Sequence, residues 1–401
     1  MKNTRLFFLL SCLFLSGMLK AQTFTTFTTT EGLSDDFIYG GIAVDQNNHI
    51  WAGTSYGVSK FDGASWTNYF MADGLADDFI RCIAVDASNN VWVGTDVGVS
   101  RFNGTSWTTY TTADGLVDNT VYAIAGDFTG AVWFGTMYGV SKFDGTEWFT
   151  YNTSNGFPSD LISTIFVDCS GKKYFGTLDS GFIIYDGSTY EVIDTADGLA
   201  DQSVKAIMKD QSGYILAGTL YGISRFDGAS YQWQNDITST DGLYHNVIMD
   251  IDVTSTGVIW VSTFVDYLVD GGMSWFNGST WTSYNTADGM SDPQIIKTAV
   301  DYDDNIWVAT GTGITKISDY TGSPLTATKE MPVVYPNPSA GAIYFSKTAA
   351  SVTVFDMSGR CVFSCNNAMS ADLSELNPGY YTLKLTEENG NIVNRKICIA
   401  K

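Results

Sequence analysis

Histidine and positive charge are scarce in this chain of 401 residues. Only 2 residues are His, and 21 Lys and Arg stand against 43 Asp and Glu, which gives a formal net charge of −22. Two histidines leave little room for histidine-based catalysis or a histidine-rich metal site. The shortage of Lys and Arg argues against a nucleic-acid-binding protein, because contacts with phosphate depend on those side chains.

Glycine and aromatic residues are abundant by contrast. The sequence has 40 Gly, an aromatic content of 14% and an apolar content of 44%. This apolar content supports a large core and excludes global disorder. The use of Gly and aromatic residues favours an all-β protein with many tight turns. The length exceeds that of one ordinary domain, so we expect two folded parts.

The N-terminus has the pattern of an export signal. A short basic segment precedes an apolar stretch at residues 6–19, and a small-residue cleavage point follows Ala21. The stretch is too short to span a bilayer comfortably, and nothing later in the chain is long and apolar enough to span. We therefore predict a signal peptide at residues 1–21 and no membrane span in the mature protein. A lipoprotein acylated at Cys12 is the alternative, but it would leave a very short apolar region.

One sequence unit recurs along most of the chain. Its clearest copy contains a Trp, a Gly-Thr pair, a Val-Ser-Lys-Phe segment and an Asp-Gly turn between Trp51 and Trp66. The copies start at Trp51, Trp92, Trp133, Tyr174, Leu216, Trp260 and Trp307, in steps of 41, 41, 41, 42, 44 and 47 residues. Such a period, with four short strands and an Asp-Gly or Asn-Gly hairpin signal in most copies, is typical of a propeller blade.

The two ends of this array complement each other. The seventh copy runs out at Ser318 without a fourth strand, whereas residues 24–29 have the aromatic spacing of that strand. Phe24 lies eight residues before Gly32, a spacing that most copies repeat. We therefore predict a seven-bladed β-propeller over residues 22–318 that is closed by its N-terminal strand, which removes the open edges of the ring.

The repeated pattern Asp-x-x-x-x-Ile/Val-Trp-x-Gly-Thr-x-x-Gly-Val-x-x-Phe-Asp-Gly resembles the two-component regulator propeller repeat, over about three quarters of the chain. Members of that family commonly form the periplasmic sensor part of hybrid histidine kinases and read extracellular saccharides. The resemblance therefore implies extracellular recognition. This sequence differs from the sensors in showing neither a membrane-spanning helix nor a kinase region.

The segment after Ser318 has a different composition. Residues 319–332 contain Pro, Thr and Ser without the repeat and are predicted to be a linker. Residues 333–401 contain Tyr335, Pro336, Asn337, Pro338, Gly359, Gly379, Tyr381 and the terminal Lys401. This segment resembles the type A C-terminal sorting domain of type IX secretion substrates in the Bacteroidetes. The resemblance implies a small immunoglobulin-like β-sandwich that binds the secretion machinery, and a protein that passes through the periplasm to be secreted or attached to the outer-membrane surface.

The cysteines do not form a disulfide framework. Five remain once Cys12 leaves with the signal peptide, which is an odd number. We expect Cys82 and Cys169 to be small buried residues. The sequence leaves open whether two of the three cysteines of the C-terminal segment form a disulfide. These cysteines are Cys361, Cys365 and Cys398.

Aspartates recur in the turns between the first and second strands of the copies. They are Asp45, Asp86, Asp127, Asp168, Asp210 and Asp301. We predict that each caps its turn by accepting hydrogen bonds from backbone N–H groups. The segment Asp301-Tyr-Asp-Asp-Asn305 is similar to a cation loop, so calcium is an alternative there. No other cofactor is predicted.

The loops on the opposite face carry the candidate binding residues. Strand counting places two sets of connections, from strand four to the next strand one and from strand two to strand three, at one mouth of the central channel. The first set contributes Asp35, Asp77, Asp118, Ser159, Asp201, His245 and Asp292, and the second contributes Tyr56, Tyr138, Tyr221, Asp266 and Tyr267. Carboxylates beside exposed aromatics suit a saccharide, whose hydroxyls need acceptors and whose flat faces stack on rings. The alternatives are a bound cation or carboxylates that only cap their own turns.

These observations favour a secreted or cell-surface protein that binds an extracellular glycan or a protein partner. His245 has no visible acid–base partner in the ring of loops, so we predict that the protein is not an enzyme. A polysaccharide lyase or hydrolase on the same scaffold is the first alternative. A structural or adhesion module without a small ligand is the second.

Overall fold

The computed structural model describes residues 22–127, 129–168, 170–210, 212–227, 232–234, 236–264, 271–318, 334–335, 339, 341–355, 361–377, 379–387 and 392–399. The regular structure in these residues is β-strand, apart from the short 3-10 helices Met71–Asp73, Thr153–Asn155 and Thr286–Asp288. The prediction of an all-β chain is confirmed. The predicted signal peptide and linker lie outside the described residues.

Within the described residues, seven four-stranded antiparallel sheets follow one another along the chain. The first three are β2(Gly41–Val44), β3(Ile50–Gly53), β4(Val58–Phe61) and β5(Trp66–Tyr69); β6(Cys82–Val85), β7(Val91–Gly94), β8(Val99–Phe102) and β9(Trp107–Tyr110); and β10(Ala123–Gly126), β11(Val132–Gly135), β12(Val140–Phe143) and β13(Trp148–Tyr151). The fourth and fifth are β14(Ile162–Val167), β15(Lys173–Thr177), β16(Phe182–Tyr185) and β17(Tyr190–Ile193); and β18(Val204–Lys209), β19(Ile215–Thr219), β20(Gly222–Asp227) and β21(Gln232–Trp233). The sixth is β22(Ile248–Val253), β23(Ile259–Thr263), β24(Gly272–Phe276) and β25(Trp281–Tyr284), and the seventh joins β26(Ile295–Val300), β27(Ile306–Thr310) and β28(Gly313–Ser318) to β1(Thr23–Phe27).

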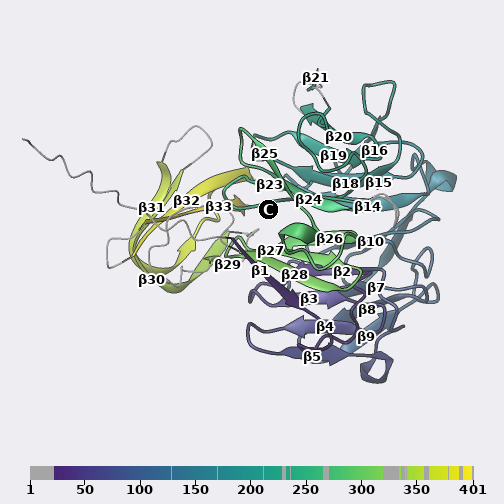
Figure 1. Ribbon diagram of the computed structural model, residues 1–401, viewed down its shortest axis with the longest axis horizontal. Coiled ribbons are helices and arrows are strands. Elements are labelled where there is room, and N and C mark those ends of the chain that lie inside the picture. Colours follow the sequence, from purple (N-terminus) through teal and green to yellow (C-terminus); the bar gives the residue numbers. More distant parts are fainter. Residues whose placement is uncertain are drawn as a thin grey trace, which may run out of the picture.

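The N-terminal strand β1 is the fourth strand of the seventh sheet. It pairs antiparallel with β28, from Thr23 opposite Ser318 to Phe27 opposite Ile314, and Figure 1 shows the purple β1 beside the green β28. The ring of Phe27 stacks on that of Trp307, with the ring centres 5.5 Å apart. The first strands of consecutive sheets contact each other in chain order, and β26 contacts β2. The sheets are thus arranged in sequence around a common centre.

The core lies between neighbouring sheets. All four residues of β3, β7 and β11 are buried, because each second strand is covered on both of its faces. Trp51 is 1% exposed and packs with Ile80 and Val91 of the next sheet. Burying an aromatic side chain of this size stabilises the fold by roughly 1.5–3 kcal/mol. The outer fourth strands are more exposed, so the second strands contribute more buried side chains to the packing between sheets than the fourth strands do.

The aspartates of the turns between first and second strands cap those turns, as predicted. Oδ1 of Asp86 accepts hydrogen bonds from the backbone N–H groups of Ser88 and Asn90, both at 2.9 Å. Its Oδ2 accepts from Nε1 of Trp92 at 2.8 Å. The same three kinds of contact recur at Asp45, Asp127 and Asp301. At the remaining two positions the third donor is Tyr174 for Asp168 and Arg225 for Asp210.

The segment considered as a calcium loop does not converge on a cation. Asp301 turns inward to Trp307 at 2.9 Å, whereas Asp304 accepts hydrogen bonds from the backbone N–H and the hydroxyl of Ser255 at 2.9 and 2.6 Å. In the part of the chain that the structure describes, no group of three or more His, Cys, Asp or Glu side chains is placed to hold a metal ion.

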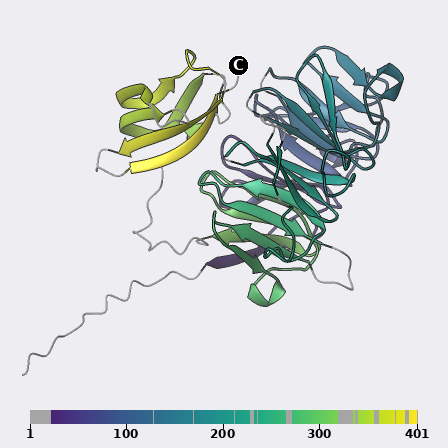
Figure 2. The same ribbon diagram turned by 90° about the horizontal axis from the view of Figure 1, so that it is seen from above.

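The C-terminal segment forms one further antiparallel sheet. Its strands are β29(Val334–Tyr335), β30(Ala342–Phe355), β31(Cys361–Asp372), β32(Gly379–Glu387) and β33(Ile392–Ile399), drawn in yellow-green and yellow in Figure 2. Val352, Val354, Leu383 and Leu385 are fully buried in its core. The hydroxyl of Tyr381 donates to the carbonyl oxygen of Asn377 at 2.8 Å. The immunoglobulin-like sandwich stays a prediction.

Of the residues predicted for the sorting signal, Tyr335 lies in β29, Gly379 begins β32, and Tyr381 is buried. Pro336, Asn337, Pro338, Gly359 and Lys401 lie outside the described residues.

Two cysteines have described thiols. Cys82 is buried, as predicted, and both Cys82 and Cys365 are free. Cys169 and the side chains of Cys361 and Cys398 lie outside the described part, so a disulfide between the last two stays a prediction. Within the described residues, no helix has the length and apolar character needed to cross a bilayer.

Candidate functional site

The turn between the second and third strands of each sheet is built on a buried threonine. In the third sheet, Oγ1 of Thr136 donates to the carbonyl oxygen of Gly139 at 2.8 Å and accepts from the backbone N–H of Tyr138 at 2.9 Å. The equivalent hydroxyl also donates to a Gly carbonyl oxygen in the other six sheets, at Thr54, Thr95, Thr177, Thr219, Thr263 and Thr310. The hydrogen bond from Thr to a Gly carbonyl oxygen thus recurs in all seven sheets, and in five of them it closes a turn of the same length.

Glycine closes this turn for a steric reason. Gly57 has a φ of +99°, and a Cβ there would lie 2.6 Å from the carbonyl oxygen of Tyr69. Neither the backbone conformation nor the space admits a side chain. The residue just before this Gly therefore sits at the apex of a rigid turn.

Exposed aromatic side chains occupy the apex in three sheets. Tyr56, Tyr138 and Tyr221 are 57%, 64% and 63% exposed, and Val97 takes the place in the second sheet. Exposed aromatics gathered on one face indicate a binding surface more often than isolated ones do. Asp266 and Tyr267, predicted for the sixth sheet, lie outside the described residues.

The apex turns of the first, second, third, fourth and seventh sheets are hydrogen-bonded to a loop of the next sheet. The backbone N–H of Gly139 donates to the carbonyl oxygen of Asp160 at 2.9 Å, and the N–H of Ile162 donates to that of Thr136 at 2.9 Å. Gly57 and Asp78 repeat the first contact between the first and second sheets. The two sets of predicted mouth loops are therefore brought together in one frame.

The predicted carboxylate ring lies on these next-sheet loops. Oδ1 of Asp77 accepts from the backbone N–H of Phe79 at 2.8 Å, two residues further on. Equivalent contacts are made by Asp35, Asp118, Asp201 and Asp292. The Oδ2 atom of these five aspartates makes no hydrogen bond to the described residues. Each aspartate therefore caps its turn with one oxygen, which leaves the other oxygen available to a ligand.

The other two ring positions accept backbone hydrogen bonds through different side-chain groups. Oγ of Ser159 accepts from the backbone N–H of Leu161 at 3.2 Å and donates to Asp179 at 2.9 Å. Nδ1 of His245 accepts from the backbone N–H of Asn246 at 3.0 Å. This hydrogen bond requires Nδ1 to be unprotonated, so the proton of the neutral imidazole lies on Nε2. The contact of His245 thus differs from that of the aspartates, because its donor is the next residue and not the residue two positions further on.

Sequence reasoning missed a cation–aromatic cluster at the first strands. The guanidinium of Arg81 lies 5.6 Å from the ring centre of Phe79 and 5.0 Å from that of Tyr122, and it is ion-paired with Asp96. Tyr39, which is 36% exposed, contacts Phe79 with ring centres 4.9 Å apart. Such packing stabilises a cation by about 0.5–2 kcal/mol. The signal in the sequence was a charged residue directly before the first-strand position opposite the strand-two Gly or its equivalent, which among the seven copies only Arg81 and Lys205 supply.

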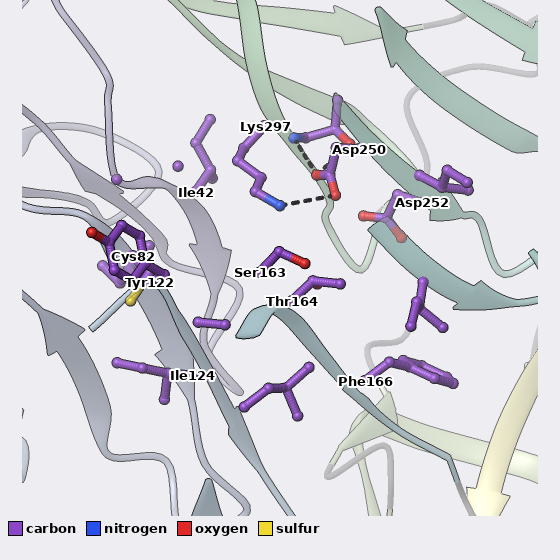
Figure 3. Close-up of a pocket in the computed structure, with 18 of the residues that line it drawn as sticks. Ile42, Cys82, Tyr122, Ile124, Ser163, Thr164, Phe166, Asp250, Asp252 and Lys297 are labelled. Atoms are coloured by element: carbon purple, nitrogen blue, oxygen red, sulfur yellow. Dashed lines mark hydrogen bonds and ion pairs between the residues drawn. The ribbon is translucent and has the colours of Figure 1, made fainter. Parts of the chain in front are cut away.

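A cavity of about 330 Å³ lies between the first strands of the seven sheets. Its lining includes residues from each sheet, among them Arg81, Tyr122, Ser163, Asp250 and Lys297, as Figure 3 shows for most of them. This volume is at the lower end of the range for small-molecule pockets. The channel is therefore a concave surface that is lined by the first strands and the residues next to them.

Repeated four-stranded sheets around a channel define a propeller-like protein. Residues 32–56 and 74–97 match the family described as two component regulator propeller. Residues 333–400 match the family described as secretion system C-terminal sorting domain. The chain thus contains two component regulator propeller repeats and a type IX secretion sorting domain. That domain implies an interaction with the secretion machinery, and secretion or export to the outer-membrane surface.

Several solved structures share the fold. The extracellular domain of the putative hybrid two component system BT3049 from B. thetaiotaomicron is 18% identical with a TM-score of 0.66, over 94% of this chain and 57% of that one. PorZ, a surface component of the type-IX secretion system of Porphyromonas gingivalis, is 16% identical with a TM-score of 0.60, over 92% and 60%. Virginiamycin B lyase from Staphylococcus aureus is 14% identical with a TM-score of 0.60, over 74% and 99%.

These likenesses show the fold alone. The chain spans about three fifths of the length of the first two proteins. No curated protein matches the sequence.

Proposed function

We propose that the chain is a secreted or cell-surface binding protein, exported through the periplasm, in which seven sheets form one closed propeller. Its mouth loops recognise an extracellular glycan or a protein partner. Closure by the N-terminal strand is supported by the β1–β28 pairing. Closure matters for binding because it holds the loops of the first and seventh sheets in a fixed relation.

One observation carries the proposal. The turn frame of buried Thr and Gly is constant, whereas its exposed apex varies among Tyr56, Val97 and Tyr138 in the first three sheets. A rigid scaffold with variable exposed residues on its loops is the usual arrangement of a recognition surface. The free carboxylate oxygens beside the tyrosines add hydrogen-bond acceptors. Together these groups suit a sugar, which offers hydroxyl donors and a flat apolar face.

We propose binding without turnover. A general base must reach the proton that it removes and needs a partner that orients it. Nδ1 of His245 accepts a hydrogen bond from the backbone of Asn246, and the described residues offer no second histidine near it. The likeness to a lyase rests on fold, at 14% identity.

A thermal-shift screen of the mature chain against a glycan panel, with and without calcium, tests the proposal. A ligand at 100 times its Kd stabilises the native state by about 2.7 kcal/mol, which is a measurable shift. A shift with an intact glycan supports saccharide binding, whereas release of shortened products would support the enzyme alternative. A sharp transition that no glycan moves, with retention of binding to cells or proteins, would favour the protein partner.

A further inference from the structure

The fifth sheet lacks aromatic side chains that fill the space between sheets elsewhere. The second-strand position of Trp51 holds an aromatic residue in six copies and Leu216 in the fifth. The fourth-strand position of Tyr69 in the first sheet is Ile237 in the fifth, where it pairs with Ile223. Each of the other six sheets has an aromatic ring at one or both of these positions.

The rings at these positions occupy a defined space in the first sheet. The indole of Trp51 stacks on Tyr69 with ring centres 5.8 Å apart and contacts Phe102 of the second sheet at 5.5 Å. Its Nε1 donates to Oδ2 of Asp45 at 3.0 Å, and Nζ of Lys60 lies 5.1 Å from its ring centre. The indole is thus enclosed by a carboxylate, a cation and two aromatic rings that come from two sheets.

The equivalent space between the fifth and sixth sheets is open. These sheets, β18–β21 and β22–β25, lie side by side in Figure 1 and contact each other through their first strands. A cavity of about 620 Å³ lies between them, which is within the range of small-molecule pockets. Its lining includes Leu216 and the counterparts of the four groups around the indole of Trp51, namely Asp210, Arg225, Ile237 and Phe276. We call this space the inter-sheet cavity.

The sixth sheet gives the inter-sheet cavity an aromatic wall. Phe276 and Trp281 both line it, with ring centres 5.0 Å apart. Val258 and Ile259 of the same sheet add buried apolar side chains to the lining. Rings and aliphatic groups of this kind favour a planar apolar ligand. None of the predicted mouth residues and none of the residues that line the channel belongs to this lining.

The charge of the lining is negative. Nε and Nη2 of Arg225 donate to Oδ2 of Asp210 at 3.1 and 2.6 Å, and the guanidinium lies 3.9 Å from the ring centre of Tyr214. This cation is therefore compensated. Asp236 and Asp241 also line the cavity, and each uses one carboxylate oxygen within the fifth copy of the repeat. The second oxygen of each makes no hydrogen bond to the described residues, so two acceptors remain for a ligand.

We propose that the inter-sheet cavity binds a small cationic aromatic molecule, of the class of an indole that carries an alkylammonium group. The ring takes the place of the aromatic side chain that the fifth sheet lacks, against Leu216 and the wall of Phe276 and Trp281. Apolar cavities left by a missing ring take up molecules of similar shape. The ammonium group faces the free oxygens of Asp236 and Asp241. This is a second ligand site, separate from the proposed glycan-binding mouth.

Calorimetry on the mature chain with tryptamine and indole-3-propionate tests the proposal. The two probes have the same ring and opposite charges, so tryptamine should bind about tenfold more tightly. Leu216→Trp restores the residue of the repeat and should remove tryptamine binding, because its side chain fills the cavity. Tyr174→Trp is the matched control, since it introduces the same residue at the same position of the fourth sheet and should leave the affinity unchanged.

Two further variants test the charge of the site. Asp236→Asn and Asp241→Asn should each lower the affinity for tryptamine by about threefold, the worth of one exposed ion pair. Asp62→Asn is their control, because it removes one charge from an exposed hairpin of the first sheet, where the second copy of the repeat has Asn103. It should leave the affinity unchanged.

Each outcome supports or overturns the proposal. If Leu216→Trp does not fold, as its thermal transition would show, the two Asp→Asn variants still test the site. Absence of tryptamine binding, equal affinities for the two probes, or wild-type affinity in folded Leu216→Trp would overturn it. An equal loss in Asp62→Asn would show a non-specific effect of charge and overturn it as well. Binding of a blocked peptide that contains Trp and Lys, without binding of tryptamine, would place a protein segment in the cavity instead of a small molecule.

Discussion

Aspartates line both faces of the ring of sheets, and they are used differently on each. On the face of the first-to-second strand turns, Asp86 engages both oxygens, with two backbone N–H groups on Oδ1 and the indole of Trp92 on Oδ2. At the mouth, Asp77 engages Oδ1 alone. Both residues cap turns. The two aspartates differ in the number of hydrogen-bond donors around the carboxylate. An aspartate with donors on both oxygens stabilises the fold, and one with a donor on a single oxygen is open to a ligand.

Substitution of the two aspartates by alanine tests this difference with the largest expected effect. Asp86→Ala leaves the buried indole N–H of Trp92 and two backbone N–H groups without their acceptor. Each such group costs about 1–3 kcal/mol, so we expect a loss of roughly 3 kcal/mol in the free energy of unfolding. Asp77→Ala should cost less than about 1 kcal/mol, because one half-exposed cap is lost. Urea denaturation of both variants measures the difference.

Asp86→Asn serves as the control for shape. It keeps one carbonyl oxygen for the turn and replaces the other acceptor with a donor that faces Trp92, so its loss should be intermediate. Equal losses in Asp86→Ala and Asp77→Ala would mean that the two rings have the same structural role.

The fold could be predicted from the sequence because each repeat contains its own signals. The buried Trp, the Gly-Thr turn and the Asp-Gly hairpin define four strands locally, and Phe24 at one end has the spacing that the other end lacks. Strand counting also predicts that the loops of Asp77 and Tyr138 share one face, and their place at the channel mouth stays a prediction. Which carboxylate oxygen stays free could not be predicted, since this depends on the path of the loop after the aspartate.

The channel charges were missed for a different physical reason. Lys205 occupies a bulge, and a bulge shifts the register between Val204 and Ala206 by one residue. Counting from the repeat motif therefore does not show which first-strand residues face each other across the channel. Only the pairing of the first and second strands places Asp250 and Lys297 at the same level.

Asp252, in the channel, differs from the aspartates of both rings. Burial, with the charge of Asp250, raises the pKa of Asp252 from 3.8 to about 7. The folded state then holds this proton more tightly than the unfolded chain does. The contribution of Asp252 to stability is complete below about pH 4 and is lost as the pH rises through about 7.

Asp252→Asn should remove this pH dependence. The difference in unfolding free energy between wild type and variant should change by at most about 1.4 kcal/mol per pH unit between pH 5 and 7, the limit for one proton. Chemical denaturation at pH 5, 6, 7 and 8 measures the slope, with Asp77→Asn as a control that should leave it unchanged. An identical slope in wild type and Asp252→Asn would show that Asp252 is ionised throughout.

The smallest effect on stability, and the one that bears most on function, concerns two exposed aromatics of the third sheet. Tyr138 stands at the mouth and Phe149 on the outer strand β13, with exposed fractions of 64% and 39%. Alanine at either position should change the free energy of unfolding by less than about 1 kcal/mol, because neither side chain is buried. Only Tyr138→Ala should weaken glycan binding, by roughly three- to tenfold, the worth of one stacking contact.

A loss of affinity in Tyr138→Ala can be assigned to the side chain, because the turn itself is kept. The hydrogen bond from the backbone N–H of residue 138 to Thr136 does not depend on that side chain. Tyr138→Phe keeps the ring and should restore most of the affinity, which separates stacking from hydrogen bonding by the hydroxyl. If Phe149→Ala weakens binding as much as Tyr138→Ala, the ligand covers the outer strands. The mouth face would then have the same purely structural role as the opposite face, and its aspartates would only cap turns.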